Sequence, residues 1–366
     1  MEYDMGKSVY FDHAAASIPS KEVLDFYGNA AGKYFANPEA VHDLAYRVKR
    51  ELTSAAERLS MLLFDRSDYP VIWGNSATEL FGMLASFPEF TASAASLLEH
   101  PALLANLRSN TRFSHLPVTR RAGIIVPEQI PGDLPLACTH QVQSELGSMP
   151  QCGKLFSLLH PRCRMLDAVQ AAGKMKLDKN SDIWVISGVK FGSPGGAAML
   201  LAPDGAYTGK LLEYAGFLRK ELYAVSRINV PEILTMVFAA EKAVAAMDEN
   251  FNKVSEINRF LRRETAELGI TPTLEADVDT SPYILNLLLP SQESAVVVRA
   301  LGKAGIYTAS GSACSAESGK PPLSLTAMGV SAKKAYRALR LSFGAANTPE
   351  DAEKFLAELK IVLKNY

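Results

Sequence analysis

Residues 182–196 read DIWVISGVKFGSPGG: an apolar run that ends in the polar turn Ser187-Gly188-Val189-Lys190, followed by glycine-rich text. A short apolar run bounded by turn residues predicts a buried strand. The pattern recurs, since apolar runs that lead into polar turns lie at 70–73, 93–98, 122–126, 134–139 and 164–166. The sequence therefore predicts an α/β fold whose large domain holds a mostly parallel sheet flanked by helices.

The sequence also contains helical patterns, as an α/β fold requires. Residues 37–63 predict a long amphipathic helix with Asn37 as its N-cap and Pro38 at its first position. Residues 231–268 predict one long or kinked helix that carries the chain out of the first domain. After it, strands are predicted at 283–289, 306–308 and 340–343, and helices at 291–303, at 332–337 and from Thr348 onward. We expect a large domain of residues 15–250 and a smaller α+β domain of residues 251–366, joined by residues 1–14.

The length and net charge of the chain indicate its number of domains and argue against some classes of binding partner. The chain has 366 residues, enough for about two domains. Its 38 Lys and Arg residues and 39 Asp and Glu residues leave a net charge of −1. Nucleic acids and anionic membranes attract proteins with a basic surplus, so neither is an expected partner. The start MEYDMGKSVYF lacks the features of a secretory signal, and we expect a cytoplasmic protein.

The cysteines divide into two groups. Cys138, Cys152 and Cys163 lie in or near apolar or proline-bounded text and are predicted to be buried thiols. Cys314 lies instead in SGSACSAESG at 310–319, whose small residues are typical of a loop. The spacing matches no metal motif, and we expect no metal.

Polar residues at the ends of the predicted strands are candidates for a ligand site, because ligands of open α/β sheets bind at the carboxyl ends of the strands. Ser76-Ala77-Thr78 opens a helix and could hold a phosphate, although such residues are more often plain helix caps. Asp167 could hold a protonated ring nitrogen, or act only as a cap. Lys190 at a buried strand end would have a lowered pKa that suits covalent binding of a carbonyl, or lie at the surface.

Two further residues could complete such a site. His100 could stack on an aromatic ring, and its alternative role is to cap a helix. Arg340 in RLSFG could bind a substrate carboxylate with its planar guanidinium, and its alternative is a surface ion pair. A phosphate cradle, a stacking ring, an acid, a lysine and an arginine together are the parts of a single cofactor site.

The chain resembles the cysteine desulfurases, pyridoxal 5′-phosphate enzymes of the class V aminotransferase group with the type I fold. The resemblance covers nearly the whole chain, from YFDHAAA at 10–16 onward. It is carried by an ordered set of strings, SATE (76–79), EHPALLANL (99–107), VQSELG (142–147), LDAVQAAGK (166–174), SGVKFGSPGG (187–196), SGSACSAES (310–318) and LRLSFG (339–344). The cysteine in SGSAC distinguishes desulfurases from other members of the group.

The resemblance implies a role for each site residue. Lys190 would bind the cofactor covalently, Asp167 would pair with its ring nitrogen and Gln170 would contact its ring hydroxyl. His100 would stack on the ring and take part in catalysis. Cys314 would take the sulfur of L-cysteine as a persulfide, while alanine leaves, and pass it to an acceptor protein for iron–sulfur cluster or thio-cofactor synthesis. The remaining positions would hold the phosphate (Ala77, Thr78, Ser187) and bind the substrate carboxylate (Arg340). A homodimer is expected.

Three positions depart from the family pattern. Val189 stands where the family has a histidine that helps to hold the phosphate. Ser144 stands where it has an asparagine near the ring hydroxyl and the substrate, a contact that Gln143 could replace. Arg227 stands where the family has a threonine that reaches the partner subunit's phosphate, and we hypothesise that it supplies the charge that Val189 does not.

These departures leave alternatives open. The protein could be a selenocysteine lyase or another amino-acid β-lyase of the same fold. It could also be a catalytically silent relative that serves as a scaffold or regulatory partner.

Overall fold

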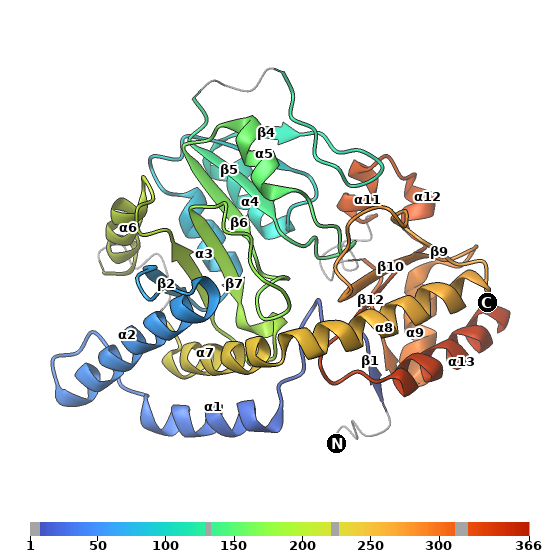
Figure 1. Cartoon of the computed structure of the whole chain (residues 1–366), viewed down its shortest axis with the longest axis horizontal. Coiled ribbons are helices and arrows are strands. Elements are labelled where there is room, and N and C mark those ends of the chain that lie inside the picture. The colour runs from blue at the N-terminus through green and yellow to red at the C-terminus, as the bar shows by residue number, and fades with distance from the viewer. Residues whose placement is uncertain (1–7, 129–132, 221–226, 312–320, 366) are drawn as a thin grey trace.

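The computed structural model describes residues 8–128, 133–220, 227–311 and 321–365. Within them a seven-stranded sheet has the order β2-β8-β7-β6-β5-β3-β4 (Figure 1). Its strands are β2 (Val71–Gly74), β3 (Ala92–Ser96), β4 (Arg112–Leu116), β5 (Leu136–His140), β6 (Cys163–Asp167), β7 (Ile183–Ser187) and β8 (Ala197–Leu201). Neighbours from β7 to β4 are parallel, and β8 runs antiparallel to both β7 and β2. The predicted mostly parallel sheet is confirmed.

Alternate residues of β7 pack against different helical layers. Trp184 and Ile186 belong to a core shared with α2 (Asp43–Phe64), α5 (Cys152–Leu159) and α7 (Val230–Ala245). Ile183 and Val185 belong to a core shared with α3 (Ala77–Ala85), α4 (Pro101–Asn110) and α6 (Thr208–Lys220). A strand covered on both faces reads as a continuous apolar run, which is why β7 was recognisable in the sequence.

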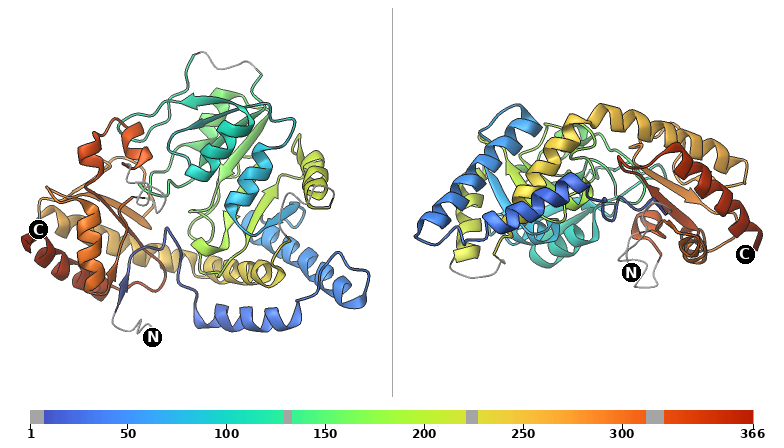
Figure 2. Two further views of the ribbon diagram at one scale, coloured as in Figure 1. Left: turned by 180° about the vertical axis from the view of Figure 1, so that it is seen from behind. Right: turned by 90° about the horizontal axis from the view of Figure 1, so that it is seen from below.

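A third core unites the two ends of the chain. Val9 and Phe11 pack with residues of α8 (Met247–Ala266), α9 (Ser294–Lys303) and α13 (Pro349–Asn365). The strands here are β1 (Val9–Tyr10), paired in parallel with β11 (Ile306–Tyr307), and the antiparallel sheet β12-β10-β9 of β9 (Thr271–Pro272), β10 (Ile284–Leu288) and β12 (Ala338–Ser342). The remaining helices are α1 (Lys21–Lys33), which lies along α7 (Figure 2), α11 (Leu323–Ala327) and α12 (Ala332–Ala335). The division at residues 14 and 250 stays a prediction, which these separate cores support.

Several sequence predictions need correction. The helix expected from residue 37 begins at Asp43, because His42 caps it by accepting the Ala45 N–H, while Asn37 instead accepts the Glu39 N–H. Residues 122–126 form only an isolated bridge between Val118 and Ile124. The long or kinked helix expected at 231–268 is interrupted at Ala246, between α7 and α8, which agrees with the kinked alternative.

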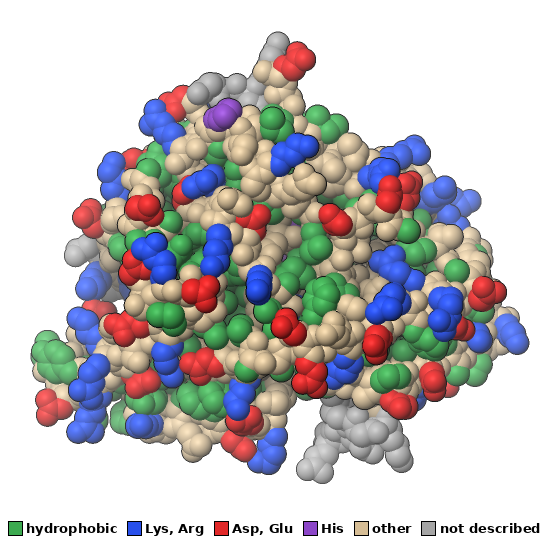
Figure 3. All heavy atoms as spheres, viewed as in Figure 1, with side chains coloured by type: hydrophobic (Ala, Val, Ile, Leu, Met, Phe, Trp, Pro, Cys, Tyr) green, Lys and Arg blue, Asp and Glu red, His purple; other side chains and the backbone are tan. Residues whose placement is uncertain are grey.

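Two strands of the seven-stranded sheet, β4 and β8, were not predicted, and neither were the two-residue strands β1 and β9. The edge strand β4 has the polar sequence RFSHL, and β8 follows directly on a glycine-rich loop. In the described residues no helix is long and apolar enough to cross a membrane. Basic and acidic side chains are interspersed over the face shown in Figure 3, as the near-zero net charge suggests.

Candidate active site

A cavity of about 280 Å³ lies at the carboxyl ends of β5, β6 and β7. His140, Asp167 and Ser187 are the last residues of these three strands, and all three line it. The cavity brings together most of the predicted site residues, namely Ala77, Thr78, His100, Ser144, Asp167, Gln170, Ser187, Lys190 and Arg340. Cys314 lies outside the described residues.

Lys190 ends a short 3-10 turn, Gly188–Lys190, directly after β7. Its amine donates a hydrogen bond to the carbonyl of Ala15, so the N-terminal segment lies across the cavity. Burial, reinforced by the nearby Arg340 charge, lowers the pKa of Lys190, against the opposing effects of Asp12 and Asp167. A lowered pKa increases the fraction of neutral amine, which is the form that attacks a carbonyl.

Asp167 is buried and its pKa is raised to about 6, mainly because burial penalises the charged form. One carboxylate oxygen accepts the Val169 N–H at 3.0 Å. The other has no hydrogen-bond partner among the described residues, and the side chain lines the cavity. A cationic ring nitrogen placed there would restore the ionised form.

Gln170 is held at both ends of its amide. Its Nε2 donates to the Ala14 carbonyl at 2.9 Å, and its Oε1 accepts from Lys174 Nζ at 3.2 Å. One amide hydrogen remains for a ring hydroxyl. Lys174 is itself buried, which lowers its pKa to about 7, with Lys190 and Arg340 contributing in the same direction.

His100 both caps a helix and lines the cavity. Its Nδ1 accepts the Ala102 N–H at the start of α4, so the proton of the neutral ring is on Nε2. Burial lowers the pKa of His100 to about 4, and the Lys190 charge adds to this. The ring is therefore neutral near pH 7, and its flat face is available for stacking.

The start of α3 supplies the predicted phosphate cradle. Ala77 and Thr78 are its first two residues, and the Ser76 hydroxyl caps it by accepting the Glu79 N–H at 3.2 Å. The capping role predicted as the alternative for Ser76 is thus confirmed. Free N–H groups and the positive end of the helix dipole suit an anion at this place.

Arg340 is buried at the floor of the cavity, so the alternative of a surface ion pair is wrong. Its Nη2 lies 2.7 Å from Asp12 Oδ1, and its Nη1 donates to the Ser144 carbonyl at 3.1 Å. Its Nε is buried without a partner in the described part of the chain. Arg340 lines the cavity, so its guanidinium is a group on which a substrate carboxylate could bind.

Arg227 does not line this cavity. It is exposed, and its Nη2 donates to the Phe35 carbonyl at 3.3 Å on another face. Gln143 lines the cavity, but its amide binds its own loop, because Oε1 accepts from the N–H groups of Glu145 and Leu146 while Nε2 donates to the Leu98 carbonyl. It does not replace the asparagine missing at Ser144.

Sequence reasoning missed four residues of the site: Asp12, Glu99, His140 and Lys174. Asp12, Glu99 and Lys174 lie inside strings that carry the family resemblance, so their place in those strings was the available signal. Glu99 and His140 form a buried pair, with His140 Nδ1 2.9 Å from Glu99 Oε2. No sequence signal joins them, because they lie in separate strand–helix units.

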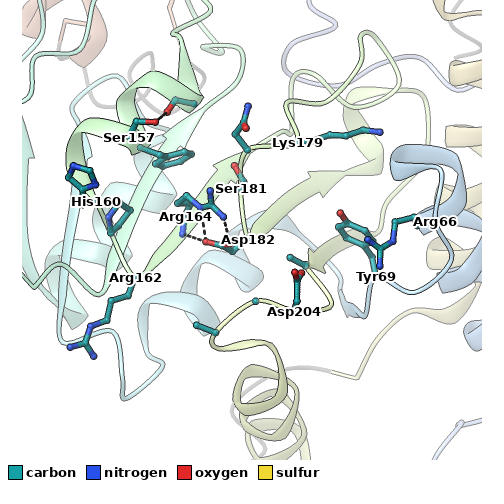
Figure 4. Close-up of a pocket in the computed structure, with 17 residues that line it drawn as sticks. Arg66, Tyr69, Ser157, His160, Arg162, Arg164, Lys179, Ser181, Asp182 and Asp204 are labelled. Atoms are coloured by element: carbon teal, nitrogen blue, oxygen red, sulfur yellow. Dashed lines mark hydrogen bonds and ion pairs between the residues drawn. The ribbon is translucent and has the colours of Figure 1, made fainter.

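A larger cavity, of about 690 Å³, lies at the opposite edge of the sheet (Figure 4). Four cations line it, but each is paired: Arg164 with Asp182, as the dashed lines show, Arg66 with Asp68, Arg162 with Asp133 and Lys179 with Asp65. Since these charges are already neutralised, and none of the predicted site residues lies here, the smaller cavity is the candidate active site.

Comparison with known proteins decides the family. The model of the aminotransferase class V family matches residues 9–355. The chain belongs to this family. The class V chain is 25% identical to cysteine desulfurase NifS of Azotobacter vinelandii, over 96% of this chain and 91% of that one. It is 26% identical to a cysteine desulfurase of Sinorhizobium fredii, over 98% of this chain and 97% of that one.

The fold agrees with that of solved structures. A NifS-like protein from Rickettsia africae superposes with a TM-score of 0.83 at 18% identity, covering 98% of this chain and 99% of that one. These comparisons confirm the predicted resemblance to cysteine desulfurases and the predicted type I fold. Class V aminotransferases are pyridoxal-phosphate enzymes, so the expected cofactor is confirmed as well.

The residues present fit this cofactor. The unpaired oxygen of Asp167 suits a ring nitrogen, the start of α3 suits a phosphate, and Lys190 has the lowered pKa of a Schiff-base lysine. The three predicted buried thiols, Cys138, Cys152 and Cys163, are confirmed as free and buried.

Proposed function

We propose that this class V protein is a pyridoxal-phosphate-dependent cysteine desulfurase that converts L-cysteine into L-alanine and passes the sulfur to an acceptor protein. The observation that carries the proposal is the convergence of Lys190, Asp167 and the buried Arg340 on one cavity. When bound, the cofactor supplies an electron sink that assists cleavage of the bonds at the substrate carbons, including the carbon–sulfur bond.

The chain's own residues have separate tasks in this reaction. The Asp167 carboxylate holds the ring nitrogen protonated, Gln170 donates to the ring hydroxyl, and His100 stacks on the ring. Thr78 and Ser187, with the N–H groups of Ala77 and Thr78, bind the phosphate. Arg340 orients the substrate by its carboxylate, and Lys190 holds the cofactor and moves protons at its amine.

Sulfur transfer is assigned to Cys314. Its sulfur bonds to the sulfur of L-cysteine as the carbon–sulfur bond breaks, which gives a persulfide and releases alanine after protonation. A cysteine in a segment of small residues suits both reaching the cavity and handing the sulfur outward.

A homodimer would complete the phosphate site. Arg227 lies away from the cavity of its own chain, beside Phe35, which is 64% exposed. Val41, Leu44 and Tyr46, which follow Phe35 in the chain, are also exposed apolar residues. In the dimer, Arg227 would reach the cofactor phosphate of the partner subunit. Arg227→Ala with unchanged cofactor affinity would refute this role, and light scattering tests the dimer.

The deciding experiment is alanine release from L-cysteine by cofactor-saturated protein under reducing conditions, with Cys314→Ala in parallel. Alanine from the wild type alone supports the desulfurase and the role of Cys314. Equal turnover by both proteins favours the β-lyase, and comparison of selenocysteine with cysteine then tests a selenocysteine lyase. No turnover, even with candidate acceptor proteins added, favours the silent relative, for which Val189 and Ser144 are the motivating departures.

The cytoplasmic location stays a prediction that fractionation tests.

A further inference from the structure

A buried charge cluster lies under the ring-binding end of the active site. Glu99, which directly precedes the N-cap of α4, accepts a hydrogen bond from the Ser96 hydroxyl at 2.9 Å through Oε1. Its Oε2 lies 2.9 Å from His140 Nδ1. Glu99 is 3% exposed and His140 is 3% exposed, so neither charge is solvated by water.

His140 and Asp167 are neighbours in the sheet. They are the last residues of β5 and β6, and they are register partners in this parallel pair. Partners in adjacent parallel strands direct their side chains to the same face, so both line the cavity from below. The other nitrogen of His140, Nε2, is buried and has no partner in the described residues.

The protonation of the imidazole follows from its neighbours. An ionised Glu99 can only accept, so His140 Nδ1 carries a proton. Two carboxylates, Glu99 and Asp167, then share one poorly solvated region, where both stay ionised only if a positive charge lies between them. The effects of Glu99 and Asp167 raise the pKa of His140 against its burial, which is the opposite of what burial alone does to a histidine.

We propose that His140 is a positioning residue that, paired with Glu99 as an imidazolium, keeps Asp167 ionised to receive the protonated ring of the cofactor. The inference rests only on the cofactor-binding part of the proposed function. When His140 is protonated, its positive charge cancels the negative charge of Glu99. Asp167 then remains as the one uncompensated negative charge of the cluster, facing the cationic ring of the cofactor. Without that charge on His140, one of the two carboxylates would take up a proton. Glu99 would keep two donors, the Ser96 hydroxyl and the His140 Nδ1–H, whereas Asp167 has one among the described residues, the Val169 N–H, so Asp167 would be the one protonated.

The other titratable groups near the cluster do not supply this charge. Two thiols lie near His140: Cys138 is on β5, and Cys152 donates from α5 to the His140 carbonyl. Burial raises the pKa of both thiols, so both stay neutral. His100 is neutral near pH 7. Lys190 is the remaining cation that acts on Asp167, and it is consumed when it binds the cofactor covalently.

The test is the pH dependence of the dissociation constant of pyridoxal phosphate, measured by equilibrium dialysis without cysteine. His140→Gln can still donate to Glu99 but carries no charge. We expect the acidic limb of the binding curve to move upward by about one pH unit from its position near the pKa of Asp167, about 6. Binding should then weaken about tenfold at pH values below the limb and about twofold at pH 7. The double variant Glu99→Gln/His140→Gln removes both charges, and its limb should return to the wild-type position.

A purely structural role predicts a different result. The double variant would then bind at least as weakly as His140→Gln, and the limb would not move in either protein; either result overturns the proposal. Thr139→Val, which alters the preceding buried residue of β5, is the matched control and should leave the limb unchanged. Since cysteine is absent, failure of the desulfurase assay would leave this result interpretable. Thermal unfolding of each apoprotein checks the fold.

Discussion

Arg340 Nη2 lies 2.7 Å from Asp12 Oδ1, although the two residues are 328 positions apart in the chain. The contact forms because the segment after β1 runs beside β12, with Asp12 bridged in parallel to Ser342. The arginine side chain is 4% exposed and the aspartate 24%. Arg340, which would bind the substrate, therefore already has a counter-charge from the N-terminal segment. The ion pair with Asp12 also fixes the orientation of its guanidinium.

Removing Asp12 should destabilise the protein. Asp12→Asn leaves the Arg340 charge buried without a counter-charge, and we expect the free energy of unfolding to fall by about 3 kcal/mol in urea titration. Asp12→Asn/Arg340→Met removes the orphaned charge and should recover part of the loss. Asp68→Asn, in the exposed pair with Arg66, is the control and should have little effect. A loss in Asp12→Asn no larger than in Asp68→Asn would contradict the prediction.

Arg340→Lys tests substrate binding. Lysine keeps the charge but loses the planar donor fork that suits a carboxylate. We expect KM for L-cysteine to rise about tenfold or more, with a smaller change in kcat, in the alanine-release assay. An equal KM would show that the carboxylate binds elsewhere.

Val189→His tests the missing phosphate partner. Val189 lines the cavity next to Lys190, and a histidine there would add a hydrogen-bond donor to an anion. Because a bond to a charged group contributes about 1.5 kcal/mol or more, the dissociation constant of pyridoxal phosphate should fall about tenfold in equilibrium dialysis. Val189→Ala adds no donor and should not tighten binding. If both variants bind alike, the phosphate does not reach this position.

The apoprotein should lose stability in acid through its buried histidines. His13 is 2% exposed, and neither ring nitrogen has a hydrogen-bond partner among the residues that the structure describes. Burial lowers its pKa to about 3. The folded pKa lies below the unfolded value of 6.5, so the unfolded state binds more protons as the pH falls below 6.5. His13 alone should cost about 2 kcal/mol between pH 8 and pH 5.

Urea titrations at pH 8 and pH 5 measure this loss. His13→Asn should lose less stability on acidification than the wild type, and His100→Gln should behave similarly, since the pKa of His100 is also lowered, to about 4. His115 is exposed on the edge strand β4, and partial burial together with Arg108 lowers its pKa, so His115→Asn should reduce the slope less than His13→Asn does. An unchanged slope in His13→Asn would mean that this ring is not buried as a neutral group.

Gly188 should not tolerate a side chain. An added Cβ would lie 2.5 Å from the Gly195 carbonyl oxygen and 2.8 Å from Met236 Cγ, and the backbone oxygen cannot rotate away. Gly188→Ala should therefore lower both the melting temperature and the affinity for pyridoxal phosphate, because Lys190 belongs to the same turn. Gly209→Ala, in α6 with open space around it, should raise stability slightly through helix propensity. Equal behaviour of the two variants would refute the steric argument.

Local patterns in the sequence were sufficient for five strands of the seven-stranded sheet, β2, β3, β5, β6 and β7, and for most of the candidate site residues. Apolar runs with both faces covered revealed β5, β6 and β7, and the polar residues that end them, among them Asp167 and Ser187, proved to line the cavity. Parallel strands bring their carboxyl ends to one edge, so strand-end residues converge wherever the strands lie in order. The family strings then assigned a role to each residue, and Lys190 and Gln170 lie where those strings implied.

The tertiary structure alone decided which charges meet. Nothing in the sequence indicates that Asp12 pairs with Arg340, that Glu99 pairs with His140, or that Ala15 receives the Lys190 amine. The tertiary structure also determined the edge strand β4 and the start of α2 at its N-cap His42. Exposed or polar segments show only a weak hydrophobic periodicity, so the sequence pattern does not reveal them. Periodicity reports which face of an element is buried, whereas an ion pair depends on strand order and register, which bring distant residues to the same few ångströms.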